Sequence, residues 1–122
     1  MSRILFIDDD ESIREFVSMA LVDEGYDVNT AAHGAAALEV IPEYKPDLIL
    51  LDMRMPIMDG WAFLKAYRQV PPPHAPIIAL TASRNAPDAQ VPPDVNNFLA
   101  KPFDLNELLD LVAQELQTSQ TS

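Results

Sequence analysis

The sequence predicts a doubly wound α/β fold, in which helices cover both faces of a parallel β-sheet. Three apolar runs of strand length support this class: Ile4–Ile7, Leu48–Leu51 and Ile77–Leu80. Apolar and polar residues do not alternate within these runs, so each strand is expected to be buried on both faces, as in a parallel sheet. Segments with helical periodicity lie between the runs, and this alternation is typical of α/β proteins.

The composition is that of one globular domain. The chain has 122 residues, of which 48% are hydrophobic and 22% are charged, and both values are ordinary for a single domain. Cysteine is absent, which excludes a disulfide framework and a thiolate metal site. We expect a cytoplasmic protein, because no apolar run has the length of a signal-peptide core or of a membrane helix.

The net charge is strongly negative, with 19 acidic and 8 basic residues giving −11. Phosphate backbones and anionic membranes select basic surfaces, so direct binding to nucleic acid or to a membrane is not expected. Overall acidity otherwise indicates only solubility. The places where the acids cluster are therefore more informative than their number.

The first half of the chain predicts two strands and two helices. The first run is followed by a helix with the apolar stripe Ile13, Phe16, Val17, Ala20 and Leu21, which follows helical spacing. Gly25 is placed to end this helix in a left-handed cap, and Tyr26–Ala31 is a weaker strand candidate. An alanine-rich helix is expected over about Ala35–Tyr44, limited by Pro42.

The second half continues the alternation. Asp59 and Gly60 are expected to start a third helix with the apolar positions Trp61, Leu64, Ala66 and Tyr67. Asn97–Ala100 is a weak strand candidate. In the last helix, Asp104 and Glu107 resemble a capping box, ahead of the core stripe Leu105, Leu108, Leu109, Val112 and Leu116. Residues 1–117 are expected to form the domain, and residues 118–122 a polar, frayed tail.

This order of elements corresponds to a flavodoxin-like, five-stranded parallel sheet with strand order 2-1-3-4-5. Three prolines interrupt the segment between the fourth and fifth strands: Pro87, Pro92 and Pro93. This segment has room for at most about one helical turn. The fourth helix of the usual pattern is therefore expected to be reduced or absent.

Polar residues follow or end the predicted strands. Asp8 and Asp9 are expected to end the first strand, Asp52 the third, Thr81 the fourth and Lys101 the fifth. The carboxyl ends of parallel strands share one edge, where such sheets bind ligands, so these side chains should converge. Two carboxylates about 4 Å apart repel by roughly 4 kcal/mol at an effective dielectric of about 20. Lys101 and a divalent cation are expected to relieve this repulsion.

The chemistry of these residues points to phosphate. Oxygen ligands without His or Cys favour Mg²⁺ or Mn²⁺ over zinc, and Mg²⁺ usually shares its coordination shell with water and a phosphate. One carboxylate then remains available as a nucleophile. Thr81 and Lys101 can donate hydrogen bonds to phosphoryl oxygens.

Four segments resemble the receiver domain of two-component response regulators, in the order and near the spacing of that family. They are ILFIDDDESIRE, PDLILLDMRMPIMDG, IIALTAS and FLAKPF, and the resemblance extends from Arg3 to about Leu116. It implies phosphorelay signal transduction. Asp52 would accept a phosphoryl group from the phosphohistidine of a histidine kinase or histidine phosphotransfer protein, and the domain would then switch conformation and signal to a protein partner.

The resemblance also implies roles for the other site residues. The metal ligands would be Asp8, Asp9, Asp52 and the backbone carbonyl of Arg54, with Asp9 the more direct ligand of the acidic pair. Thr81 would bind the phosphoryl group in the active state, and Lys101 would pair with the aspartyl phosphate. Phe98 stands at the position of the family's switch aromatic.

The chain departs from the family pattern in the segment before the last strand. Relatives usually carry a helix and a GADDYL-like segment before the last strand, where this chain has PPDVNNFL. Because no output domain follows, a stand-alone receiver is expected. Its chemistry would be limited to self-catalysed phosphotransfer and slow autodephosphorylation, so it is not expected to be a multi-substrate enzyme.

Other functions remain open. A phosphohydrolase with an aspartate nucleophile would favour a D-x-D motif and a substrate cap, and a degenerate receiver would act only as a binding module. A flavin-binding protein would need neutral phosphate donors in the first loop. Individual residues also have structural explanations: Asp10 is expected to cap a helix, and Phe98 is a candidate for the core.

Overall fold

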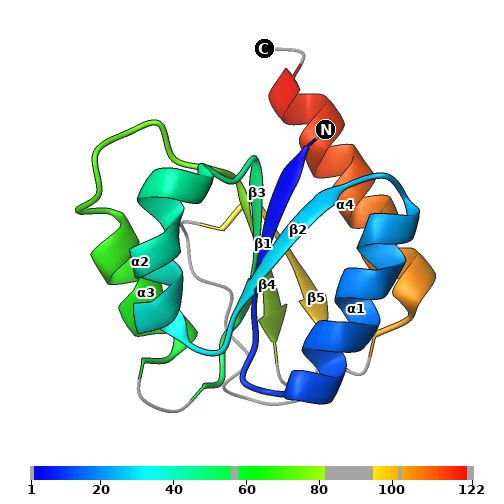
Figure 1. Cartoon of the computed structure of the whole chain (residues 1–122), viewed down its shortest axis with the longest axis horizontal. Coiled ribbons are helices and arrows are strands. Elements are labelled where there is room, and N and C mark those ends of the chain that lie inside the picture. Colours follow the sequence, from blue (N-terminus) through cyan, green and yellow to red (C-terminus); the bar gives the residue numbers. More distant parts are fainter. Residues whose placement is uncertain (1, 56–57, 82–94, 102, 121–122) are drawn as a thin grey trace.

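The chain folds into a five-stranded parallel sheet between two layers of helices (Figure 1). The computed structural model describes residues 2–55, 58–81, 95–101 and 103–120. The strands are β1 (Arg3–Ile7), β2 (Asp27–Ala31), β3 (Leu48–Asp52), β4 (Ile77–Thr81) and β5 (Asn97–Ala100). Their order is β2-β1-β3-β4-β5 and each neighbouring pair is parallel. The predicted sheet order is confirmed.

The described part of the chain contains four helices: α1 (Glu11–Asp23), α2 (Gly34–Tyr44), α3 (Gly60–Tyr67) and α4 (Leu105–Gln120). None of these helices is long and apolar enough to cross a membrane. The segment 82–94, where the sequence predicts a reduced or absent helix, lies outside the described residues. The predicted boundary after residue 117 falls within α4, and the division into a domain and a tail stays a prediction.

The core has two parts, one on each face of the sheet. Helices α2 and α3 cover one face, and α1 and α4 cover the other (Figure 1). In β1, Leu5 and Ile7 belong to the first part, and Ile4 and Phe6 belong to the second. All four side chains are fully buried, because successive residues of a strand point to opposite faces. This explains why the strand sequences are continuously apolar.

Side-chain caps begin three of the described helices. His33 caps α2 and its Nδ1 accepts a hydrogen bond from Ala36 N at 3.2 Å, a role that the sequence did not predict. Asp10 caps α1 and accepts a hydrogen bond from Ile13 N at 3.1 Å. Asp59 caps α3 and accepts one from Ala62 N at 2.9 Å. Gly25 follows the end of α1 with a φ of +95°. The cap roles predicted for Asp10, Asp59 and Gly25 are confirmed.

Some predicted details of the helices are wrong. Phe16 and Trp61 were expected in the core but are 59% and 47% exposed, whereas Phe63 is fully buried. Residues two apart lie on roughly opposite sides of a helix, at about 100° per residue, so α3 can bury Phe63 or Trp61 but not both. Pro42 lies inside α2 instead of limiting it. The helix ends at Tyr44 nonetheless, as predicted.

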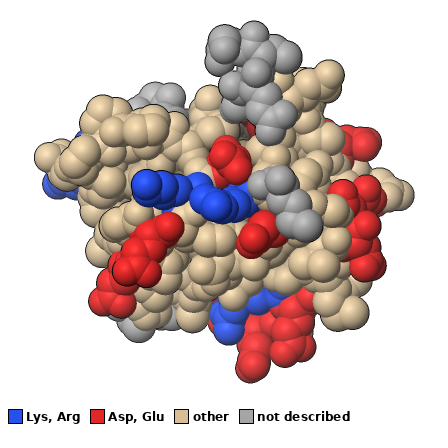
Figure 2. All heavy atoms as spheres, turned by 45° about the horizontal axis from the view of Figure 1, so that its top comes forward, with Lys and Arg blue, Asp and Glu red and all other residues tan. Residues whose placement is uncertain are grey.

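Charged residues of both signs are spread over the face of the molecule that Figure 2 shows. Figure 2 shows the molecule turned so that the end carrying both chain termini comes forward, with basic side chains near the middle of the view and acidic side chains around them. No single patch on this face therefore accounts for the net charge of −11.

Candidate functional site

Acidic residues from β1 and β3 meet at the carboxyl edge of the sheet. Asp8, Asp9 and Asp52 each offer a carboxylate oxygen, and the three oxygens lie within 4.8 Å of one another. β1 and β3 are neighbours, and Ile7 lies opposite Leu51. Asp8 follows Ile7 and Asp52 follows Leu51, so these two acids lie side by side. The structure thus brings together the three acids that the sequence places at this edge.

Asp8 is buried and held from several directions. Its Oδ1 accepts a hydrogen bond from Asp10 N at 2.9 Å, and its Oδ2 accepts one from Lys101 Nζ at 3.2 Å. Its backbone N–H donates to Ala31 O at 3.1 Å. Asp9 is exposed instead. Asp8 is therefore the fixed member of the pair, and Asp9 is the carboxylate more open to an incoming cation.

Asp52 is the second buried acid of the cluster and is 4% exposed. Its Oδ1 accepts a hydrogen bond from Arg54 N at 3.1 Å, and its Oδ2 lies 3.3 Å from Lys101 Nζ. Burial raises the pKa of Asp52 to about 6 and Asp8 adds to the rise, while Arg54 N–H and Lys101 oppose it. A carboxylate poised in this way is more basic than usual, which suits a nucleophile.

Lys101 joins the two buried acids. Its Nζ lies 3.2 Å from Asp8 Oδ2 and 3.3 Å from Asp52 Oδ2. Burial by itself lowers the pKa of Lys101, but the charges of Asp52 and Asp8 outweigh burial and raise this pKa overall. Lys101 therefore stays charged. Three ionised carboxylates and one ammonium leave two negative charges in the cluster, which matches a divalent cation.

The donor set of the cluster fits a hard cation. All three candidate ligands are carboxylates, with no His or Cys among them, and Mg²⁺ prefers such oxygen ligands. Asp8, Asp9 and Asp52 are the residues that could hold it. The N–H of Arg54 contacts Asp52, and the metal-facing role expected for the Arg54 carbonyl stays a prediction.

Thr81 and Phe98 have different environments. Thr81 is the last residue of β4 and is 6% exposed. It follows Leu80, which is the strand partner of Asp52, so Thr81 lies next to the cluster at the same edge. Phe98 of β5 lies opposite Ala79 of β4 and is 48% exposed. The core explanation for Phe98 is therefore wrong, and its role as a switch stays a prediction.

Arg14 is a neighbour of the cluster that the sequence patterns do not single out. Its Nη1 donates to the backbone oxygen of Asp8 at 2.6 Å. A backbone carbonyl is an acceptor that every residue type offers, so this contact leaves no motif. The only available signal is position, because Arg14 comes four residues after the helix cap Asp10.

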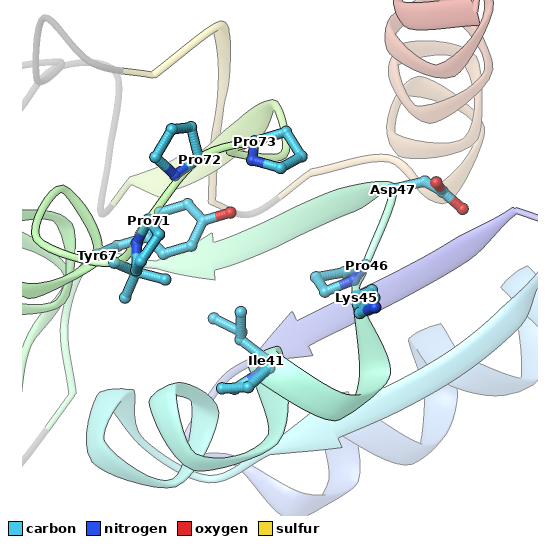
Figure 3. Close-up of a pocket in the computed structure, with 10 residues that line it drawn as sticks. Ile41, Lys45, Pro46, Asp47, Tyr67, Pro71, Pro72 and Pro73 are labelled. Carbon is cyan, nitrogen blue, oxygen red and sulfur yellow. The ribbon is translucent and has the colours of Figure 1, made fainter.

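A cavity of about 560 Å³ lies at the other end of the strands, away from the acidic cluster (Figure 3). It is lined by segments that precede β3 and β4, including Ile41, Pro46, Tyr67 and Pro71–Pro73. The Asp47 carboxylate points away from it (Figure 3) and accepts a hydrogen bond from Arg3 N at 2.8 Å. The cavity is thus at the amino ends of the strands and takes no part in the acidic cluster.

Comparisons with known proteins agree with this geometry. The family model of the response regulator receiver domain matches residues 4–113. The regulatory protein AtoC of Escherichia coli (strain K12) is 34% identical over 119 residues, which are 96% of this chain and 26% of AtoC. The DNA-binding transcriptional regulator NtrC of the same organism is 39% identical over 113 residues, 90% of this chain and 24% of NtrC. The chain spans about a quarter of the length of these two relatives.

Solved structures include proteins of nearly the same length. A response regulator receiver domain protein (CheY-like) from Methanospirillum hungatei JF-1 superposes with a TM-score of 0.85 at 28% identity, over 99% of this chain and 98% of that one. The chemotaxis response regulator CheY4 of Vibrio cholerae gives 0.79 at 33% identity, over 93% and 98%.

Proposed function

The chain belongs to the response regulator receiver domain family, and from this premise we propose that it is a Mg²⁺-dependent phosphoacceptor in two-component signalling. Asp52 would accept a phosphoryl group from the phosphohistidine of a histidine kinase or a histidine phosphotransfer protein. The observation that carries this proposal is the meeting of Asp8, Asp9 and Asp52 at one sheet edge, with Lys101 between the two buried acids.

The proposed transfer uses the contacts around Asp52. A carboxylate oxygen of Asp52 forms the new P–O bond, the P–N bond of phosphohistidine breaks, and its electron pair returns to the imidazole nitrogen. Lys101, 3.3 Å from the carboxylate, is placed to pair with the phosphoryl oxygens, and Thr81 supplies a further donor. Mg²⁺ bound by the acids would supply positive charge to the same oxygens.

The proposed switch connects this chemistry to a surface. Thr81 is buried at the end of β4, and Phe98 on neighbouring β5 is half exposed. Phosphorylation would draw Thr81 toward the phosphoryl group, and Phe98 would move with the change in packing, so that a downstream protein meets a different surface. The protein would act in the cytoplasm, with only self-catalysed transfer and slow autodephosphorylation as its chemistry.

The proposal is tested by phosphorylation with acetyl phosphate and MgCl₂, followed by intact-protein mass spectrometry. The wild type should gain one phosphoryl group, and the matched variant Asp52→Asn should gain none. The signal should disappear in EDTA. Equal labelling of wild type and D52N, or no labelling of the wild type, would show that Asp52 is not the acceptor. Steady turnover of an external phosphate ester would instead indicate a phosphohydrolase.

A further inference from the structure

We propose that Arg14 is a positioning residue for the metal site, because its guanidinium holds the peptide group between Asp8 and Asp9. The proposal rests on the metal-dependent function proposed above. Nη1 of Arg14 donates to the backbone oxygen of Asp8 at 2.6 Å. The donor is charged, and charge-assisted hydrogen bonds are shorter and stronger than neutral ones.

The contacts of the loop show why this carbonyl matters. The N–H of Asp8 is bound to Ala31 O and its carboxylate is bound to Asp10 N and Lys101 Nζ, so Asp8 itself is well fixed. The side chain of Asp9 makes no hydrogen bond or ion pair with the described residues, and it is exposed. The direction of the Asp9 carboxylate therefore depends on the backbone that leads into it. Arg14 restrains that backbone at the Asp8 carbonyl.

The position of Arg14 on α1 makes the restraint firm. Arg14 N donates to Asp10 O at 3.0 Å, within the first turn of the helix. Asp10 in turn caps α1 through Ile13 N. The Arg14 guanidinium thus reaches back from the capped helix α1 to the loop residue Asp8, which precedes the cap. Its planar fork carries several donors in a fixed geometry, which a lysine ammonium does not reproduce.

Positioning and charge have opposite effects on a bound cation. If Arg14 acts only as a nearby positive charge, its removal should tighten Mg²⁺ binding, because one repulsion is lost. If Arg14 orients Asp9, its removal should weaken binding, as is found for residues that orient metal ligands. The sign of the change therefore separates the two roles.

The test is isothermal titration calorimetry of the full chain with MgCl₂, beside thermal unfolding in EDTA. Arg14→Met keeps most of the apolar stem and should raise the Kd for Mg²⁺ about tenfold. Arg14→Lys keeps the charge and one donor group and should give a Kd between wild type and R14M. The control Lys65→Met removes the same charge from the exposed side of α3 and should leave the Kd unchanged.

Several outcomes would overturn the positioning role. An R14M Kd within twofold of wild type, or lower, would do so, as would an equal rise in K65M. If R14M shows no cooperative unfolding, R14K carries the test, and an R14K Kd equal to wild type overturns the proposal. Absence of Mg²⁺ binding by the wild type would instead contradict the proposed function itself.

Discussion

Lys101 Nζ lies 3.2 Å from Asp8 Oδ2, although 93 positions separate the two residues in the chain. The same ammonium lies 3.3 Å from Asp52, so one cation joins the acids of two neighbouring strands. It offsets only part of the repulsion in the cluster, because Asp9 adds a third carboxylate. The cluster is therefore under-neutralised until a further positive charge arrives.

Asp52→Asn is expected to stabilise the metal-free protein at pH 7. Burial raises the pKa of Asp52 from 3.8 to about 6, so the folded chain binds this proton more tightly than the unfolded chain. Protonation of Asp52 therefore stabilises the folded chain. This stabilisation is complete below about pH 4 and is lost as the pH rises through about 6. Ionised Asp52 then costs on the order of 2 kcal/mol at pH 7. Urea unfolding in EDTA should show D52N more stable at pH 7, and a difference that does not shrink toward pH 4 would contradict this.

Mg²⁺ is expected to raise the Tm of the wild type at pH 7 and to have little effect on Asp9→Asn. At ten times its Kd, a ligand of the folded state adds about 1.4 kcal/mol, which corresponds to several degrees for a domain of this size. Glu11→Gln is the matched control, because Glu11 is an exposed acid at the start of α1. An equal loss of the Mg²⁺ effect in E11Q and D9N would indicate general screening.

Gly60→Ala is expected to destabilise the fold by about 2 kcal/mol. A Cβ at Gly60 would lie 2.7 Å from Met53 Cα, and this backbone cannot yield without moving the residue next to Asp52. Gly34→Ala is the comparison, because its Cβ would meet the Met58 Sδ at 2.8 Å and that flexible side chain can turn away. Chemical denaturation should rank G60A well below G34A in stability, and equal losses would show that the Met53 contact is not decisive.

Phe63→Ala is expected to cost about 3–5 kcal/mol, because the ring is fully buried and its removal leaves a cavity. Trp61→Ala should cost less than about 1 kcal/mol, because this side chain is 47% exposed. Trp61 and Phe63 are two residues apart in α3, and each change removes one aromatic ring, so each variant is a control for the other. Urea denaturation measures the two losses, and the reverse ranking would show that α3 is turned the other way in solution.

The sheet and the convergence of the acids were predictable, because both follow from where apolar runs end. Leu48–Leu51 is followed at once by Asp52, and parallel strands bring such ends to one edge. The burial of Phe63 was not predictable from spacing, because a short helix can turn either side toward the sheet. The contact from Arg14 was not predictable either, because a backbone carbonyl is present at every position. What the sequence pattern misses is thus the rotation of helices and the bonds to main-chain atoms.

The strand that leads to Lys101, β5, is one of the two edge strands of the sheet. Among the described strands, β5 is hydrogen-bonded to β4 alone, whereas β1 and β3, which lead to the acids, have a neighbour on both sides. Fraying of a sheet begins at such an edge, where each residue has fewer bonds to lose. Fraying of β5 would move the Lys101 ammonium away, while Asp8, Asp9 and Asp52, which do not depend on an edge strand, would stay together. The pairing of β5 with β4 would therefore limit how long the cluster retains its counter-charge.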